Sequence, residues 1–503
     1  MPEPFNACVA LLDHWVETGQ GDRIAIRSRG RSWTYSEVLS EVERIAGGLR
    51  ARGVRPEERV LLVLVDSVPF AAAFLATLRI GAVPVLVNPL LPIRDISVIA
   101  ADSRARLALV SDERVDAAAT ATLLATSEVD VVLSTDNWDD AWPAGDPTPY
   151  PTWDESPGFW LCTSGSTGRP KLAMHRHIDL VLSAQTYAHE VLGITEADVF
   201  WSVGPAFHAY GLGNSIAFPF SVGATAVLEP TRPPTPALVA EMMARERPTL
   251  FFTIPTVTAA LNASTLPDDT FASVRLAVSA AEPLPADTYR RFLERFGVQI
   301  LDGIGSTELN HIYCSNRPGA RARPGTSGQP VRGYDVRLLD DEEREVGDDT
   351  PGHLWVAGPT LATGYWCRND QNRQAFVGRY LRTGDMYERS ADGYFTYLGR
   401  SDDMLRVGGE WVSPAEVEAV LIELDDVLEA AVIGERDGEG IQRPVAFIVP
   451  APGATTDVGV LESHCRERLA GFKRPRRFDF VDTLPKTTTG KIQRFKLRDE
   501  EQR

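Results

Sequence analysis

A segment rich in small and hydroxyl-bearing residues, 163–171 (TSGSTGRPK), is the first part of the sequence that could bind an anion. Small residues let backbone N–H groups approach an anion closely, and hydroxyl groups with a lysine complete a phosphate cradle. The GxxxxGKS/T pattern of P-loop proteins is absent because Leu172 follows Lys171, which argues against kinase and P-loop chemistry. The alternative interpretation is a flexible surface loop.

Further motifs follow in a fixed order: 303–308 (GIGSTE), 380–385 (YLRTGD), 399–404 (GRSDDM) with 407–410 (VGGE), and 484–492 (LPKTTTGKI). Taken alone, each has a structural interpretation, such as a helix cap at Glu308, the end of a turn at Asp385 or a solvated Lys491. Together with 163–171, the ordered set resembles the acyl-adenylate-forming superfamily of acyl-CoA synthetases, peptide-synthetase adenylation domains and luciferases. The flanking segments look most like benzoate–CoA ligases and related aryl-CoA ligases; they are 207–214 (FHAYGLGN), 218–226 (FPFSVGATA), 301–311 (LDGIGSTELNH) and 316–320 (NRPGA).

The resemblance implies a reaction in which a carboxylate attacks the α-phosphate of ATP and expels pyrophosphate, so two anions must meet. Thr307 is similar to the family's hydroxyl at the α-phosphate, and Glu308 to its Mg²⁺ ligand. Lys491 is similar to the lysine that bridges the carboxylate and the phosphate in the transition state, and these three form the implied catalytic set. The residues that the resemblance assigns to ATP are Thr163, Ser164, Gly165, Ser166, Thr167, Gly168, Lys171, Ala280, Asp302 and Gly303 (adenine), Thr307, Asp385 (ribose), Arg400 and Lys491.

The implied acyl pocket has small and flat residues, which favour an aromatic ring over a long alkyl chain. They are His208, Ala209, Tyr210, Gly211, Ile304, Gly305 and His311, with core packing as the alternative for Tyr210 and His311. The sequence departs from the family at Leu172 and Ala281, where a glycine is common. His208 stands where a benzoate ligase has an apolar phenyl ring, and a polar substituent on the substrate ring would explain it.

The second half-reaction implied by the resemblance transfers the acyl group to CoA after a small domain swings. Asp402 lies at the family's pivot, and Gly408, Gly409 and Lys473 at its pantetheine tunnel, where glycines leave room for a thiol arm. We therefore expect ATP, Mg²⁺, CoA and an aromatic acid as ligands. The alternative is an adenylating enzyme with another acceptor, either a carrier protein or nitrite in the diazotisation of an aromatic amine. Monooxygenase chemistry on the same fold, and nucleic-acid binding by the basic segment 473–498, rank below these.

The motifs require a fold that positions them, and the pattern of the first 330 residues predicts an α/β class. Apolar strand patterns such as 59–65 and 83–87 alternate with helical patterns such as 70–78, which predicts doubly wound, mostly parallel sheets. We also expect Ser36 to cap the helix that follows it.

The domain organisation follows from a change of pattern. Residues 331–399 carry short strand patterns between Gly and Asp turns, which predicts a small β-rich subdomain. We expect a large N-terminal domain over 1–399, a hinge over 400–403 and a small, mobile α+β C-terminal domain over 404–503 that carries the catalytic lysine.

The composition excludes several classes of protein. The 503 residues include 51 Lys+Arg and 69 Asp+Glu, so the net charge of 51 − 69 = −18 disfavours general binding to nucleic acid or anionic membranes. The chain is 44% hydrophobic and 24% charged, as in ordinary globular proteins. It has five scattered cysteines, no signal-peptide pattern and no apolar stretch of about 18 residues. We expect a cytoplasmic enzyme with no nucleic-acid or membrane partner, as a monomer or a homodimer.

Overall fold

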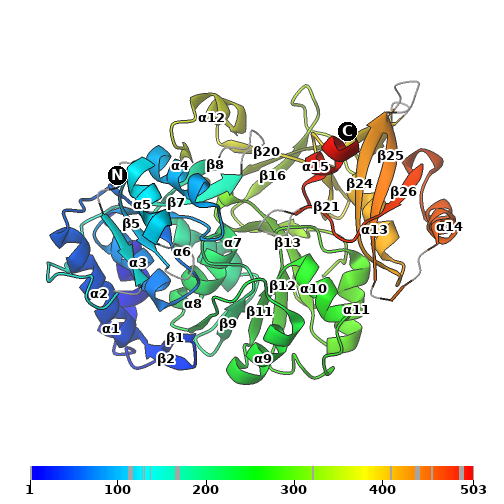
Figure 1. Cartoon of the computed structure of the whole chain (residues 1–503). Coiled ribbons are helices and arrows are strands. Elements are labelled where there is room, and N and C mark those ends of the chain that lie inside the picture. Colours follow the sequence, from blue (N-terminus) through cyan, green and yellow to red (C-terminus); the bar gives the residue numbers. More distant parts are fainter. Residues whose placement is uncertain are drawn as a thin grey trace.

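The computed structural model of the chain has a large body and a smaller one beside it (Figure 1). It describes residues 3–111, 117–126, 129, 131–135, 138–164, 170–319, 322–407, 410–436, 442–451, 453–454, 457–486 and 492–501. In Figure 1 the smaller body, drawn in orange and red, holds the C-terminal elements, and all earlier elements belong to the larger one.

The first sheet has seven strands in the order β18-β8-β7-β4-β3-β5-β6. The strands from β7 to β6 in this order run parallel, and β8 and β18 run antiparallel to their neighbours. Their bounds are β3 (Arg59–Val63), β4 (Val83–Leu86), β5 (Ala105–Val110), β6 (Val131–Ser134), β7 (Pro157–Ser164), β8 (Pro170–Arg176) and β18 (Gly364–Tyr365). The helices α3 (Val68–Arg79), α4 (Ile93–Ser103) and α5 (Ala117–Thr126) connect the parallel strands. The alternation predicted from the sequence is confirmed here.

The second sheet has nine strands in the order β15-β14-β13-β12-β11-β9-β10-β1-β2. Its interior strands are parallel, and β2, β14 and β15 are antiparallel additions at the two edges. The bounds are β1 (Ile24–Ser28), β2 (Arg31–Thr34), β9 (Val199–Ser202), β10 (Thr225–Leu228), β11 (Leu250–Thr253), β12 (Leu276–Ser279), β13 (Ile300–Gly305), β14 (Ile312–Ser315) and β15 (Gln329–Pro330). Its helices include α2 (Tyr35–Ala51), α9 (Pro236–Glu246), α10 (Pro255–Asn262) and α11 (Ala286–Phe296).

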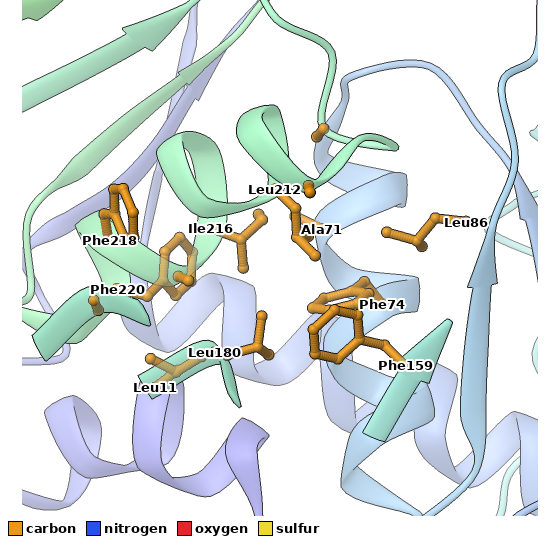
Figure 2. Close-up of a cluster of buried hydrophobic side chains, with 14 of the residues drawn as sticks. Leu11, Ala71, Phe74, Leu86, Phe159, Leu180, Leu212, Ile216, Phe218 and Phe220 are labelled. Carbon is orange, nitrogen blue, oxygen red and sulfur yellow. The ribbon is translucent and has the colours of Figure 1, made fainter. Parts of the chain in front are cut away.

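A hydrophobic core joins the two sheets through the helices between them (Figure 2). Helix α3 is buried along almost its whole length, and its Phe74 meets Phe159 of β7 edge-to-face with ring centroids 6.0 Å apart. Opposite α3 lies the helical stretch formed by α7 (Ala209–Leu212), η4 (Gly213–Ala217) and α8 (Phe218–Ser221), which contributes Leu212 and Phe220. Burying a side chain of this size stabilises the fold by about 1.5–3 kcal/mol. The core therefore fixes the carboxyl ends of both sheets relative to each other.

A five-stranded antiparallel sheet follows, as the short strand patterns predicted. It consists of β16 (Asp335–Leu339), β17 (Gly352–Ala357), β19 (Phe376–Val377), β20 (Tyr380–Arg389) and β21 (Phe395–Arg400), with α12 (Asn369–Ala375) before β19. Strand β21 leads directly into the smaller body.

The smaller body is an α+β unit. A hairpin of β22 (Leu405–Val407) and β23 (Glu410–Val412) precedes a sheet of β24 (Val427–Arg436), β25 (Gln442–Pro450) and β26 (Arg477–Phe480). Helices α13 (Pro414–Ile422), α14 (Val458–Arg468) and α15 (Arg494–Glu501) complete it. Ser413 caps α13 by accepting a hydrogen bond from the Glu416 N–H. The fold class predicted from the sequence, a large α/β domain with a smaller α+β domain, is confirmed.

One predicted cap is wrong. Thr34, and not Ser36, is the N-cap of α2, because its hydroxyl accepts from the Glu37 N–H while the Glu37 carboxylate accepts from the Thr34 N–H. This reciprocal capping box satisfies two donors at once, and Ser36 lies inside the first turn.

Within the described ranges, no helix has the length and apolar character of a membrane span.

Candidate active site

The GIGSTE motif forms a tight reversal at the carboxyl end of β13. Backbone of the returning chain lies so close that a Cβ on Gly305 would come within 2.6 Å of the His311 carbonyl oxygen. A Cβ on Gly303 would come within 2.9 Å of the Ile312 Cγ2 and 3.0 Å of the Cys314 carbonyl oxygen, so Gly305 excludes a Cβ and Gly303 leaves little room for one. The reversal presents Thr307 and Glu308 on the single 3-10 turn Thr307–Leu309.

Tyr365 links this turn to the end of the 163–171 segment. Its hydroxyl donates to the Glu308 Oε1 at 2.7 Å, and the Lys171 Nζ lies 4.9 Å from the centre of its ring. Burial is the first cause that raises the pKa of Tyr365 above its usual value, and the Glu308 charge adds to it. The structure thus brings together Lys171 and Glu308 from two predicted motifs. Tyr365 was missed because a single aromatic residue in a two-residue strand has no sequence spacing that distinguishes it from a packing residue.

Thr163 and Lys171 face each other in the β7–β8 hairpin, so the structure gives the positions of the two ends of the 163–171 segment. The predicted residues Gly165, Ser166, Thr167 and Gly168 lie outside the described residues, as do Gly408, Gly409 and Lys491. Ser164 ends β7, and its side chain is also outside the description.

Asp385 and Arg400 face each other on β20 and β21. The Arg400 Nη1 donates to the Asp385 Oδ1 at 3.0 Å and to the Thr383 carbonyl at 2.9 Å. Burial is the largest single effect and opposes the charge of Arg400, but the Asp385 and Asp402 carboxylates and Tyr397 together outweigh it and raise the pKa of the guanidinium. The pair therefore keeps the Asp385 carboxylate in a fixed position on β20.

Asp302 lies on β13, next to the end of β12 that leads into Ala280. It is 6% exposed, and its Oδ2 accepts from the Leu284 N–H at 3.3 Å. Its Oδ1 has no hydrogen-bond partner among the described residues. Burial raises the pKa of the Asp302 carboxyl well above its usual value. The oxygen without a partner is a hydrogen-bonding group that a ligand can satisfy.

Tyr210, Gly305 and His311 come together between α7 and β13. The His311 Nε2 lies 3.3 Å from the Tyr210 carbonyl oxygen, and the two rings are 5.5 Å apart. Burial lowers the pKa of His311 to about 3, so the ring is neutral near pH 7. His208 is the N-cap residue of α7, Ala209 and Gly211 lie in this helix, and Ile304 precedes Gly305 in β13. Aromatic rings and glycines therefore meet at this place, with the His311 ring neutral.

Asp402 and Lys473 lie away from this centre. Asp402 follows β21, its side chain is 71% exposed, and its Oδ1 is 3.9 Å from the Arg400 Nε. Lys473 is bound to Glu416, with its Nζ 2.7 Å from Oε2 and 2.8 Å from Oε1. The smaller body contacts the larger one through Arg291, whose Nη2 lies 2.9 Å from the Asp425 Oδ1.

Comparison with known families identifies the class of this protein. The family model described as "AMP-binding enzyme" matches residues 12–366, and the model "AMP-binding enzyme C-terminal domain" matches residues 416–491. The chain belongs to the AMP-binding enzymes of the acyl-adenylate-forming superfamily, which confirms the resemblance seen in the sequence.

Individual relatives are similar over the whole chain. The benzoate–CoA ligase of Thauera aromatica is 42% identical over 99% of this chain and 96% of its own length. Among solved structures, the anthranilate CoA ligase AuaEII in complex with anthranoyl-AMP has a TM-score of 0.95 at 36% identity, with 99% and 98% of the two chains covered. A benzoate CoA ligase from Burkholderia xenovorans LB400 has a TM-score of 0.91 at 38% identity, with 98% and 100% covered.

Ala281, one of the departures from the family pattern, has a left-handed backbone with φ of 77°. A Cβ in this region costs about 1–2 kcal/mol, so Ala281→Gly should raise the free energy of unfolding of the large domain by about 1 kcal/mol. Equilibrium urea unfolding measures this change. Ala280→Gly is the matched control, because Ala280 is 3% exposed and is not in the left-handed region; it should lower the stability. An equal loss of unfolding free energy in both variants would contradict backbone strain at Ala281.

Proposed function

We propose that this protein is an AMP-forming aryl-CoA ligase, an acid–thiol ligase that acts on a benzoate-like acid. It activates the acid with ATP to an acyl-adenylate and then forms the aryl-CoA, with AMP and pyrophosphate as the other products. The observation that carries the proposal is the 42% identity to a benzoate–CoA ligase over 99% of this chain. The match spans both domains, and the relatives at 42% and 39% identity are both named as CoA ligases, which favours CoA over a carrier protein or nitrite as the acceptor.

The triphosphate would bind between the 163–171 segment and the Thr307–Glu308 turn. Lys171 supplies positive charge, and the Thr307 hydroxyl contacts the α-phosphate. Within the described residues there is no group of three or more His, Cys, Asp or Glu side chains that could hold a metal. Mg²⁺ is commonly bound by one or two carboxylates together with substrate phosphates, so the Glu308 carboxylate fits it. When bound, Mg²⁺ neutralises charge on the phosphates.

The nucleoside would bind across the strand ends. Asp385, held by Arg400, accepts hydrogen bonds from the ribose hydroxyls. Adenine lies along Ala280, Asp302 and Gly303, where the Asp302 Oδ1 without a described partner can bond to the base. These contacts set the α-phosphate at the Thr307 turn.

The aromatic ring would lie between α7 and the end of β13, against Ala209, Tyr210, Gly211, Ile304, Gly305 and His311. The neutral His311 suits an uncharged ring, and its pKa of about 3 keeps it neutral at physiological pH. His208, at the start of α7, would contact a polar ring substituent.

In the first step, a carboxylate oxygen attacks the α-phosphorus and pyrophosphate leaves. Lys491 stabilises the charge that converges there. In the second step, the CoA sulfur attacks the acyl carbon, the thiol proton passes to solvent and AMP leaves.

We assign the N-terminal domain to 1–399, the hinge to 400–403 with Asp402 as the pivot, and the C-terminal domain to 404–503. Gly408, Gly409 and Lys473 would line the CoA tunnel, and Lys473 must leave Glu416 to meet a CoA phosphate.

The purified protein should release AMP and pyrophosphate when it is given ATP, Mg²⁺, CoA and an aromatic acid. A panel of benzoates with hydroxyl or amino substituents, assayed for pyrophosphate and thioester, measures this. Carrier protein and nitrite serve as the comparison acceptors. Formation of ADP, or a preference for medium-chain fatty acids over all aryl acids, would falsify the proposal.

Lys491→Ala should slow acyl-adenylate formation by about 10²–10³-fold, because the lysine acts where transition-state charge develops. Single-turnover measurement of the adenylate gives this rate. The variant should still form thioester from a pre-made aryl-adenylate. Lys496→Ala, which removes an exposed lysine a few positions later in the sequence, is the control and should adenylate normally. A normal adenylation rate in Lys491→Ala would refute the role of this lysine.

Asp402→Pro should leave adenylation intact and sharply slow thioester formation, because proline fixes φ near about −65° at the pivot. Asp402→Ala removes the exposed carboxylate but keeps backbone freedom, so it should support both half-reactions. Rapid-quench assays of each step test the pair. Equal loss of both steps in the proline variant would speak against a pivot at this residue.

A further inference from the structure

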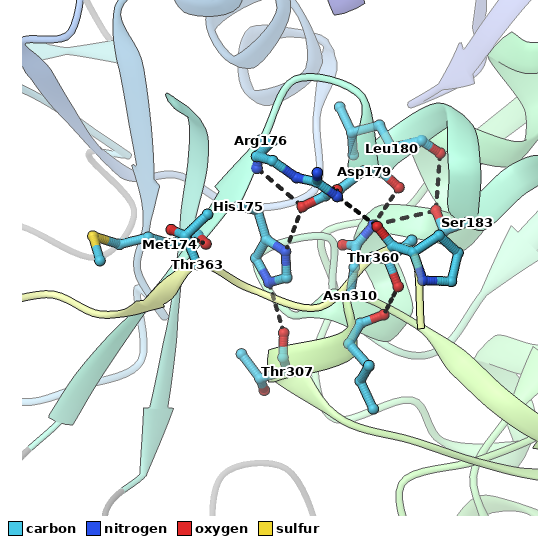
Figure 3. Close-up of polar contacts among 12 residues, drawn as sticks. Met174, His175, Arg176, Asp179, Leu180, Ser183, Thr307, Asn310, Thr360 and Thr363 are labelled. Carbon is cyan, nitrogen blue, oxygen red and sulfur yellow. Dashed lines mark hydrogen bonds and ion pairs between the residues drawn. The ribbon is translucent and has the colours of Figure 1, made fainter. Parts of the chain in front are cut away.

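We propose that His175, a residue outside the predicted motifs, is a positioning residue for adenylation that holds the Thr307–Glu308 turn in place (Figure 3). The inference rests on the proposed function, because that function gives the turn its role. His175 belongs to β8, the strand that leaves the 163–171 segment. It therefore joins the two parts of the chain that would bind the triphosphate.

The imidazole ring of His175 is fixed on all sides. The residue is 1% exposed, and its ring stacks on Phe159 with centroids 5.0 Å apart and planes 13° apart. Its Nε2 lies 2.8 Å from the Thr307 carbonyl oxygen. A carbonyl oxygen only accepts, so Nε2 carries the hydrogen and donates it. The ring is thus a rigid donor that meets the first carbonyl of the turn.

The other ring nitrogen is braced by Asp179. The Asp179 Oδ2 lies 3.2 Å from Nδ1 and also accepts from the Arg176 N–H at 3.0 Å. The Arg176 guanidinium donates to the Asp179 Oδ1 at 2.7 Å, and the Asn310 amide donates to the Asp179 carbonyl at 3.1 Å. Figure 3 shows the ring between Asp179 and Thr307.

Each carbonyl of the turn has a donor from another part of the chain. The Glu308 carbonyl accepts from the Ala362 N–H at 2.8 Å, and the Leu309 carbonyl accepts from the Thr360 hydroxyl at 2.6 Å. The 360–362 segment therefore holds the second and third carbonyls. His175 holds the first, which belongs to the residue whose hydroxyl would contact the α-phosphate. The Asn310 N–H also donates to the Thr307 carbonyl, at 3.3 Å, from within the turn. Loss of the shorter Nε2 bond would therefore leave the Thr307 carbonyl with this weaker local bond, while the two contacts to the 360–362 segment remain.

A single 3-10 turn has few hydrogen bonds of its own, so external donors decide its position. A displacement of about 1 Å at a reacting group can cost about 10²-fold in rate, and removing a partner that orients a metal ligand typically costs about 10–100-fold in activity or metal affinity. We therefore expect His175 to affect the steps that use the triphosphate and to leave aromatic-acid binding unchanged.

Three substitutions separate the donor from the packing. His175→Phe keeps the stacked ring without a donor, His175→Gln can place an amide N–H near the Nε2 position, and His175→Asn reaches only the Nδ1 position. We expect kcat for adenylation to fall at least 10-fold in the Phe and Asn variants, with KM for the aromatic acid unchanged. The Gln variant should recover most of the rate. If the Phe variant does not fold, the contrast between Gln and Asn carries the test.

Hydrogen exchange of the ligand-free protein gives a readout that does not depend on activity. Amides of 307–311 should exchange faster in His175→Phe than in the wild type and be protected again in His175→Gln. His177→Gln is the control, because His177 is equally buried but accepts from the Ala7 N–H, away from the turn. It should leave both the exchange of 307–311 and the KM values unchanged.

Failure of the inference about His175 can be distinguished from failure of the proposed function. If the wild type forms no aryl-adenylate, or Glu308→Gln is as active as the wild type, the proposed function or its assignment of the turn fails. If the wild type and Glu308→Gln behave as expected but His175→Phe matches the wild type, the inference about His175 is overturned. Equal impairment of Gln, Asn and Phe at position 175 would also overturn it, since it would point to packing alone.

Discussion

Repulsion between a carboxylate and a triphosphate is the constraint on which the arrangement of this protein depends. Two like charges 4 Å apart repel by about 1 kcal/mol in bulk water and by about 4 kcal/mol near a protein surface. The chain itself carries a net charge of −18, so its average field works against both ligands. Positive charge and hydrogen-bond donors must therefore be concentrated locally, at atoms that the fold holds still.

The fold provides such atoms by placing the ends of several strands close together. The β7–β8 hairpin brings Lys171, the reversal after β13 brings Thr307 and Glu308, and β18 brings Tyr365 between them. These segments are far apart in the sequence and are held by the core between the two large sheets. The catalytic lysine that we propose comes from the other domain. A cation delivered by a separate domain can act in one half-reaction and be absent in the next.

The sequence was sufficient to predict most of the fold, because its patterns are local. Alternating strands and helices indicated the doubly wound sheets, and the short strands between Gly and Asp turns after residue 331 indicated the small β-rich subdomain. The order of the motifs identified the family. The motifs are recognisable in the sequence because some of their glycines, such as Gly305, stand where the returning backbone leaves no room for a Cβ. The cap at Thr34 was missed because Ser36 is an equally good capping residue by type, and only the reciprocal bond with Glu37 distinguishes them.

Contacts across the fold could not be predicted in the same way. Tyr365 and His175 lie about 57 and 132 positions from their partners Glu308 and Thr307, so no spacing relates them. The ion pair between Lys473 and Glu416 also depends on how α13 packs, so the sequence did not reveal it. Lys473, which we predicted to contact CoA, is bound to this carboxylate in the structure. At Ala281, by contrast, the sequence alone provided a useful signal. This departure from the family pattern marked a position whose backbone is left-handed, a conformation that favours glycine.

The central claim is that the carboxylate of an aromatic acid attacks the α-phosphorus of ATP. Benzoate labelled with ¹⁸O in its carboxyl group tests this directly when the AMP formed in the presence of CoA is examined by mass spectrometry. If the acyl-adenylate is the intermediate, its cleavage leaves one labelled oxygen in AMP and none in pyrophosphate. Unlabelled AMP, or label in orthophosphate with ADP as the nucleotide product, would contradict the account.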